Sequence, residues 1–160
     1  MIGGKLMKKL LSVILLCFSI FGCSSAKLVS NAQIPEGKET IYLNFDNTQT
    51  TVDAGGVVIG NMIFSDVQTA SLNTLNNRML AKDILTEKGY KVTQKLENAD
   101  MILYAGCESS EVKTVVTIVL VDAKTEEEYA VANGSYGMGM DLNGDIKGAL
   151  KNALQSIPNR

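Results

Sequence analysis

The sequence predicts an α+β domain, with two helices packed on one face of a mixed or antiparallel sheet of about four to five strands. Apolar residues recur at helical spacing in two places, residues 65–88 and 143–157. Between these places come several strand patterns in succession, and one of them, "TVVTIVLVDA", is apolar on both faces. Consecutive strands that follow a helix are typical of a sheet covered by helices on one side.

The first strand pattern is "ETIYLNFDN", in which Ile41, Leu43 and Phe45 alternate with Tyr42 and Asn44. This alternation predicts a half-buried strand. Residues 47–64 follow, and their Thr, Asn and three glycines favour a loop or a short hairpin, although "VVIGNMIF" is apolar. One interpretation is a hairpin packed on the domain. The other is a flexible apolar loop that touches a partner or the membrane, because an exposed apolar patch of that length needs a purpose.

The first helix is expected between residue 65 and Lys88, with Gly89 as the residue that stops it. Its start has three possible N-caps, namely Ser65, Thr69 and Ser71. One apolar stripe is expected to face the core. The stripe consists of Leu72, Leu75, Met79, Leu80 and Ile84.

The second half of the chain predicts further strands and the last helix. "YKVTQKL" is a polar strand, residues 101–105 a buried strand, and "EYAVANGSYG" forms a hairpin with the preceding "KTVVTIVLVDA". Because "KTVVTIVLVDA" is apolar on both faces, this strand is expected at the centre of the sheet. The last helix is expected to begin at a cap, Asn143 or Asp145, and to end at Pro158. Its apolar face consists of Ile146, Leu150, Ala153, Leu154 and Ile157.

The N-terminus has the layout of an export signal. Lys5, Lys8 and Lys9 precede an apolar stretch of 12 residues, 10–21. This stretch is too short to span a hydrocarbon core, which needs about 20 residues. A basic region, a short apolar region and a small residue before the cut are typical of a secretory signal peptide. We therefore expect residues 1–22 to be a signal peptide.

The residues that follow this stretch, Ile20, Phe21, Gly22 and Cys23, resemble the bacterial lipobox. The resemblance implies cleavage between Gly22 and Cys23, a diacylglycerol thioether on the Cys23 thiol, and an N-acyl chain on the new amine. Two or three chains would hold the protein on a membrane, whereas one chain binds reversibly. Ser24, by resemblance to diderm lipoproteins, favours the outer membrane, facing the periplasm. The alternative is a plain secretory signal in which the cysteine is accidental.

Removal of the signal would leave a lipid-anchored flexible tether, residues 23–38, and a single α+β domain, residues 39–160. The signal contains three lysines and no acids, so 12 basic and 17 acidic residues remain, a formal charge of −5. An acidic domain without a basic stripe argues against nucleic acid and against anionic lipid as electrostatic partners. The membrane is therefore expected as a partner through the lipid, together with another envelope protein.

The residues offer little for catalysis, and we expect no enzyme, no catalytic residue, no metal and no cofactor beyond the lipid on Cys23. The chain has no histidine, the commonest general base and metal ligand. Asp141, Asn143 and Asp145 resemble the start of a calcium loop, but Ile146 and Asn152 stand where that loop requires glycine and glutamate. Cys107 is expected to be a small buried residue at a strand end.

The chain resembles a widespread family of small bacterial lipoproteins of unknown function in the order of its segments. These are the first helix, "EKGY", "ENADMILYAG", "TIVLVDAKTEEEYAVANGSYG" and a last helix. The motifs that carry this resemblance are Gly89-Tyr90, Ala99-Asp100 and the turn "DAKT" at residues 122–125. A second resemblance, from "ETIYLNFDNT" to "LTEKGYKVTQKLENADMIL", is to the conjugative complement-resistance (surface-exclusion) lipoproteins. Neither family supplies a catalytic residue.

These observations predict a lipid-anchored, non-enzymatic protein of the cell envelope that binds another envelope component. Two alternatives stay open. One is a small-ligand carrier, which needs an apolar cavity between sheet and helices. The other is a role in surface exclusion or serum resistance, which rests on the second resemblance.

Overall fold

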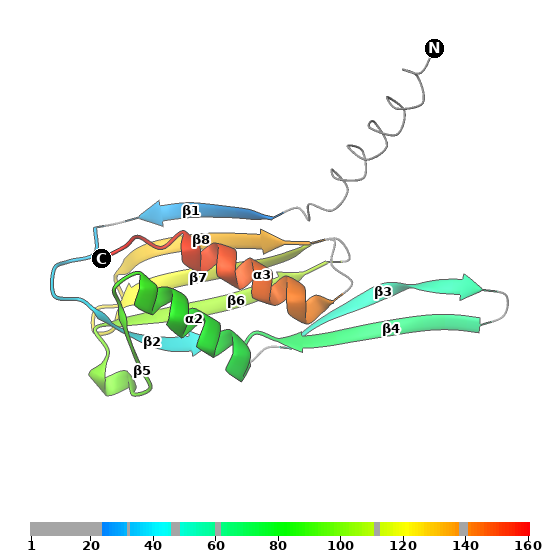
Figure 1. Ribbon diagram of the computed structural model, residues 1–160, viewed down its shortest axis with the longest axis horizontal. Helices are drawn as coiled ribbons and strands as arrows, with labels where there is room; N and C mark the ends of the chain where they lie inside the picture. Colours follow the sequence, from blue (N-terminus) through cyan, green and yellow to red (C-terminus); the bar gives the residue numbers. More distant parts are fainter. Residues whose placement is uncertain (1–23, 32, 46–48, 60–61, 111–112, 138–140) are drawn as a thin grey trace, which may run out of the picture.

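The computed structural model describes residues 24–31, 33–45, 49–59, 62–110, 113–137 and 141–160. It confirms an α+β fold: two helices lie on one face of a mixed six-stranded sheet, and a separate two-stranded sheet extends beyond it (Figure 1). In chain order the elements are β1 (Ser25–Asn31), β2 (Thr40–Phe45), β3 (Gln49–Ile59), β4 (Met62–Ser71), α2 (Leu75–Glu87), β5 (Lys91–Thr93), the 3₁₀ turn η1 (Leu96–Asn98), β6 (Met101–Ser109), β7 (Thr114–Asp122), β8 (Glu128–Tyr136) and α3 (Leu142–Gln155).

The main sheet has the strand order β1-β8-β7-β6-β2-β5. The β1/β8, β8/β7 and β7/β6 pairs are antiparallel, and β2 is parallel to both β6 and β5. Parallel neighbours need a long crossover connection, and α2 lies on the connection between β2 and β5. The strand β7 lies inside the sheet, as its two apolar faces predict.

The core lies between the sheet and the helices. Ile41, Leu43 and Phe45 of β2 are buried, which confirms the predicted alternation. The predicted apolar face of α3 is also buried. Each fully buried aliphatic side chain stabilises the fold by roughly 1.5–3 kcal/mol. The largest fully buried side chains are Tyr90, Ile41, Leu72, Leu85, Met101, Leu103, Ile118, Leu120, Ile146, Leu150, Leu154 and Ile157.

Helix α3 approaches β8 so closely that glycine is required on both elements. A Cβ atom on Gly134 would lie 2.0 Å from the Ala149 carbonyl oxygen and 2.2 Å from the Ala153 amide nitrogen. A Cβ atom on Gly148 would lie 2.6 Å from the ring of Tyr136. The backbone atoms next to Gly134 cannot yield to such a contact, and the Tyr136 ring lies against Gly148, so these two glycines allow the helix to approach the sheet.

The main sheet has one strand more than the sequence predicts. The predicted tether is structured in part, since residues 25–31 form β1 and pair with β8, through Ser25 opposite Ser135 among other pairs. This edge strand raises the strand number to six, whereas the expected polar strand "YKVTQKL" is present as the shorter β5. The small and polar residues of β1 carry a weak strand signal, and pairing of their backbone groups with β8 supplies what their side chains do not.

The first helix begins at Leu75, which is later than any of the three expected caps, Ser65, Thr69 and Ser71, would place it. Residues 62–71 form β4, which pairs with β3, and the helix N-cap is Thr74, whose side chain accepts from the Asn77 amide. The expected stripe therefore faces the core only in part, because Leu75 is 74% exposed and Met79 is 54% exposed. The residues that α2 buries are Asn77, Ala81, Ile84 and Leu85.

The ends of the helices otherwise follow local chemistry. Gly89 has a φ of +92°, and its amide donates to the Thr86 carbonyl, which confirms it as the residue that stops α2. The N-cap of α3 is Asp141, whose carboxylate accepts from the Asn143 amide at 3.1 Å. The expected caps, Asn143 and Asp145, lie inside the first turn instead. Across the described residues, no helix is both long and apolar enough to cross a membrane.

Candidate functional site

The predicted lipidation and cleavage residues, Cys23 and Gly22, lie outside the described residues. The structure does place their neighbour, because β1 begins at Ser25. Two residues of extended chain span at most about 7 Å. Ser25 is held in turn by β8, since its Oγ atom lies 2.7 Å from Oγ of Ser135. The first described strand therefore starts at the edge of the main sheet, beside β8.

Strand register identifies which end of the sheet this is. Ser25 lies opposite Ser135, Ser135 opposite Val115, and Val115 opposite Glu108 near the end of β6. We call this the Ser25 end. Strand β2 runs parallel to β6 and finishes there at Phe45. The β3–β4 hairpin starts four residues later and extends beyond the same end (Figure 1).

The β3–β4 hairpin divides into a polar base and an apolar tip. At the base, Gln49 pairs with Ser71 and Thr51 with Thr69. The register shifts between Ala54 and Val57, after the two acids, Asp53 and Asp66. The three pairs of the tip join apolar residues only: Val57 with Phe64, Val58 with Ile63, and Ile59 with Met62. The predicted loop or short hairpin is thus a long one, and it pairs only with itself among the described strands.

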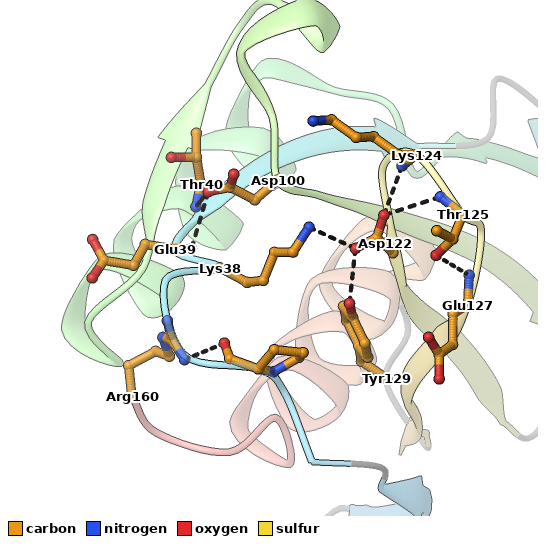
Figure 2. A network of polar contacts seen from close by, with 11 residues as sticks. Lys38, Glu39, Thr40, Asp100, Asp122, Lys124, Thr125, Glu127, Tyr129 and Arg160 are labelled. Carbon is orange, nitrogen blue, oxygen red and sulfur yellow. Dashed lines mark hydrogen bonds and ion pairs between the residues drawn. The ribbon is translucent and has the colours of Figure 1, made fainter.

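The opposite end of the sheet contains a polar network centred on the carboxylate of Asp122 (Figure 2). The Nζ atom of Lys38 lies 2.7 Å from Oδ2, and the Tyr129 hydroxyl donates to Oδ2 at 2.8 Å. The amides of Lys124 and Thr125 donate to Oδ1 at 2.8 and 3.0 Å. We call this the Asp122 end. The network holds the residues before β2 against the β7–β8 turn.

Both titratable groups at the centre of this network have shifted pKa values. The Lys38 ammonium, followed by the amides of Lys124 and Thr125, holds the pKa of Asp122 well below its usual range. Burial, helped by the neighbouring Asp122 carboxylate, raises the pKa of Tyr129 to about 12. The carboxylate therefore stays ionised and the phenol stays protonated near neutral pH. Neither is suited to exchange protons with a substrate there.

Asp100, the residue directly before β6, lies at the same end of the sheet. Its Oδ2 atom accepts from the Thr40 amide at 2.9 Å and from the Glu39 amide at 3.1 Å. The amide of Thr40, followed by that of Glu39, lowers the pKa of Asp100. The backbone of Asp100 also accepts from the Ala123 amide. This aspartate therefore fixes the start of β2 beside β6.

The C-terminal residues close the Asp122 end. Lys88 donates to the Ile157 carbonyl at 2.6 Å, and the hydroxyl of buried Tyr90 donates to the Pro158 carbonyl at 3.1 Å. The Arg160 amide donates to the Lys88 carbonyl. All three motifs of the family resemblance, Gly89-Tyr90, Ala99-Asp100 and the turn at 122–125, thus lie at this end. Their contacts join segments of the chain that are distant in sequence.

An open groove of about 450 Å³ lies elsewhere, between α2 and the sheet edge at β5. Arg78 is already engaged in its wall, since it donates to the Leu43 carbonyl at 3.2 Å and its guanidinium lies 5.8 Å from the centre of the Phe45 ring. The sequence did not predict this groove, because the helical spacing of apolar residues assigned Leu75 and Met79 to the core. The residues that line the groove are Leu43, Leu75, Arg78, Met79, Lys82, Val92, Thr93 and Gln94.

The remaining candidates agree with a structural role. Cys107 lies half-buried in β6, where it packs against the core, with its Sγ atom 4.0 Å from Oγ of Ser109. Asp141 and Asp145 belong to the start of α3 rather than to a calcium loop. Among the described residues, no group of three or more Cys, Asp or Glu side chains is arranged to hold a metal ion.

The molecule is therefore an α+β sandwich whose polar network is occupied by its own chain and whose hairpin projects from the other end. No family model matches the sequence, and no curated protein matches it. Solved structures do share the fold. The PelC dodecamer from Paraburkholderia phytofirmans superposes with a TM-score of 0.52 at 14% identity, over 86% of this chain and 100% of that one. Its L103M variant gives 0.50 at 13% identity, over 86% and 99%.

A third structure of this kind is a DUF4136 family protein from Bacteroides thetaiotaomicron, with a TM-score of 0.43 at 11% identity, over 84% of this chain and 93% of that one. At 13–14% identity, the similarity to the two PelC structures concerns the fold alone.

Proposed function

We propose that this chain is a lipid-anchored, non-enzymatic protein of the cell envelope that binds another envelope component. The observation that carries the proposal is the sequence Ile20-Phe21-Gly22-Cys23 directly behind a 12-residue apolar stretch. The start of β1 at Ser25 is compatible with it, because an anchor on Cys23 would hold the domain close to the bilayer. The occupied polar network at the Asp122 end gives no competing reason to propose catalysis.

Incorporation of labelled palmitate tests the anchor. The wild-type chain should take up label, and Cys23→Ser should abolish it. Cys17→Ser is the matched control, because it alters a cysteine of the signal that follows Leu16 rather than a small residue, and it should leave the label unchanged. Label that persists in Cys23→Ser, or a mature N-terminus other than Cys23, would contradict the anchor.

The membrane that receives the protein is tested separately. We propose the outer membrane, facing the periplasm, on the basis of Ser24. Density fractionation should place the wild type with outer-membrane markers and should shift Ser24→Asp toward inner-membrane markers. Equal distributions of the two chains would contradict the role of Ser24 but not the anchor.

The bound component is tested by crosslinking in the envelope, followed by capture of the lipidated chain. The control is the Cys23→Ser chain exported with a plain secretory signal, which shares the domain but lacks the lipid. The PelC structures are described as dodecamers, so a second copy of this chain is one partner to look for. Recovery of the same proteins with both chains would show that the anchor does not direct the interaction.

A ligand-carrier role receives less support. Carriers enclose their ligand in a cavity between elements of the fold. Here the space between the sheet and the helices is filled by fully buried side chains such as Leu103, Leu120 and Leu150. The groove beside β5 is open and lies at the margin of this core.

A further inference from the structure

We propose that the tip of the β3–β4 hairpin, residues 57–59 and 62–64, enters the surface of the bilayer in which Cys23 is anchored. This inference rests on the proposed lipid anchor for its direction. It adds a second membrane contact, made by the folded domain itself. The occupant is a lipid surface, and a protein partner or a second copy of the chain is the competing outcome of the test.

The direction of the hairpin is the first argument. Both β1 and the hairpin emerge at the Ser25 end of the sheet, as the strand register and Figure 1 agree. The anchor residue lies within about 7 Å of Ser25 along the chain. A bilayer that receives the lipid therefore lies on the side of the Ser25 end, which is the side toward which the hairpin extends past the body of the domain.

The residue types at the tip are the second argument. Three consecutive residues of each strand are apolar, and successive residues of a strand belong to opposite faces. Neither face of the ribbon is therefore polar at its tip. The nearest charged residues of the hairpin, Asp53 and Asp66, precede the apolar pairs on the side of the domain. A polar base followed by three apolar pairs is the pattern expected of a segment that crosses from water into lipid.

The depth of insertion follows from the length of the tip. Three residues of strand span about 10 Å, which corresponds to the roughly 5–10 Å that amphipathic segments occupy at the boundary of headgroups and acyl chains. The outer edge of each hairpin strand has no paired strand among the described residues. Unpaired backbone groups are costly in hydrocarbon. The tip is thus confined to the interfacial region.

The charge of the domain indicates what kind of attraction this is. The chain after residue 22 has a formal charge of −5 and no basic stripe, so anionic lipids would repel it. Contact through an apolar tip needs no anionic lipid and is insensitive to salt. Neutral phosphatidylcholine vesicles are therefore a sufficient probe, and salt dependence distinguishes this contact from an electrostatic one.

Tryptophan fluorescence provides the first experiment, because the chain contains no tryptophan. Ile59→Trp places a reporter at the tip, and Thr69→Trp places the matched reporter at the base. In the lipidated chain, reconstituted in phosphatidylcholine vesicles with brominated acyl chains, the tip reporter should shift to shorter wavelength and be quenched. The base reporter should show neither change. An unquenched tip in vesicles that carry the lipidated chain would overturn the proposal and leave the anchor intact.

Vesicle flotation of the Cys23→Ser chain without its signal separates the hairpin from the lipid. This chain should float weakly with phosphatidylcholine vesicles, to the same extent at low and high salt. Val58→Glu combined with Ile63→Lys should abolish flotation, since it places a charge pair in the apolar tip. Thr51→Glu combined with Thr69→Lys places the same pair, with the same net charge, at the base and should retain it.

The outcomes of the two experiments are distinct. Flotation of the variant with the charge pair in the tip would overturn the proposal. Loss of flotation to the same extent in the variant with the charge pair at the base would also overturn it. Crosslinking of the tip to a protein or to a second copy, without quenching by lipid, would also overturn it. A chain that is never palmitoylated but floats through its tip would support the hairpin contact and refute the anchor. Circular dichroism of each variant verifies that the domain remains folded.

Discussion

The main body, which is the six-stranded sheet with its two helices, differs from the β3–β4 hairpin in how far packing explains its residues. In the main body, contacts between distant parts of the chain account for particular residues, as with Asp122 and Lys38 or Gly134 and α3. The hairpin pairs only with itself among the described strands. The apolar residues of its tip therefore have no explanation in the pairing of the main sheet. Packing therefore explains the choice of residues in the main body, whereas the apolar residues of the tip require a functional explanation.

Substitution of Gly134 is expected to have the largest effect on stability. Gly134→Ala would place a Cβ atom against the backbone of α3 and force the helix away from β8. Overpacking of this kind costs up to about 3 kcal/mol and occasionally more. Gly106→Ala is the control, because a Cβ atom there meets nothing within 4 Å. Urea unfolding should separate the two variants, and equal free energies of unfolding would contradict the proposed close approach.

The next effect concerns acid. Asp122 has a lowered pKa in the folded state and an ordinary value of 3.8 when unfolded. Its stabilising contribution is therefore fully present above about pH 4. It is lost as the pH falls toward the lower pKa of the folded state. Thermal unfolding should show Asp122→Asn below the wild type at pH 7, with the gap narrowing under acid. A constant gap would show that the ionised carboxylate is not what stabilises the Asp122 end.

A smaller effect is expected in alkali. Burial raises the pKa of Tyr129 from 10.0 to about 12, so the phenol of the unfolded chain ionises first. The stabilisation by the protonated phenol is complete below pH 10 and is lost as the pH rises to about 12. The wild type should therefore lose more stability over this interval than Tyr129→Phe does. Parallel curves for the two proteins would contradict the raised pKa.

The smallest effect on stability should come from shortening the hairpin. A chain in which an Asn-Gly turn replaces residues 53–67 keeps the base pairs of β3 and β4. Isolated two-stranded hairpins are marginally stable, and loop closure depends weakly on length. The free energy of unfolding should thus change by less than about 1 kcal/mol. A large loss in urea unfolding would show that the hairpin belongs to the packed body after all.

Much of the body could be predicted because its signals are local. The alternation in β2, the apolar strand β7 and the buried face of α3 each follow from residue spacing. The start of helix α2 could not be placed from the sequence, because Ser65, Thr69 and Ser71 are all suitable caps, while the backbone of residues 62–71 pairs with β3. Short apolar segments are ambiguous between helix and strand until a partner decides. The polar network was visible only as motifs, since the sequence does not say that Lys38 meets Asp122.

The sequence by itself determined the α+β class, the glycine that ends α2 and the candidate lipid anchor at Cys23, since each depends on residues within one segment. Only the tertiary structure decided that the segment after Cys23 is an edge strand and that the hairpin leaves the sheet at that same end. Both depend on backbone pairing between residues that are far apart in the chain. Such pairing uses the amide and carbonyl groups that every residue shares, so side-chain patterns do not reveal it.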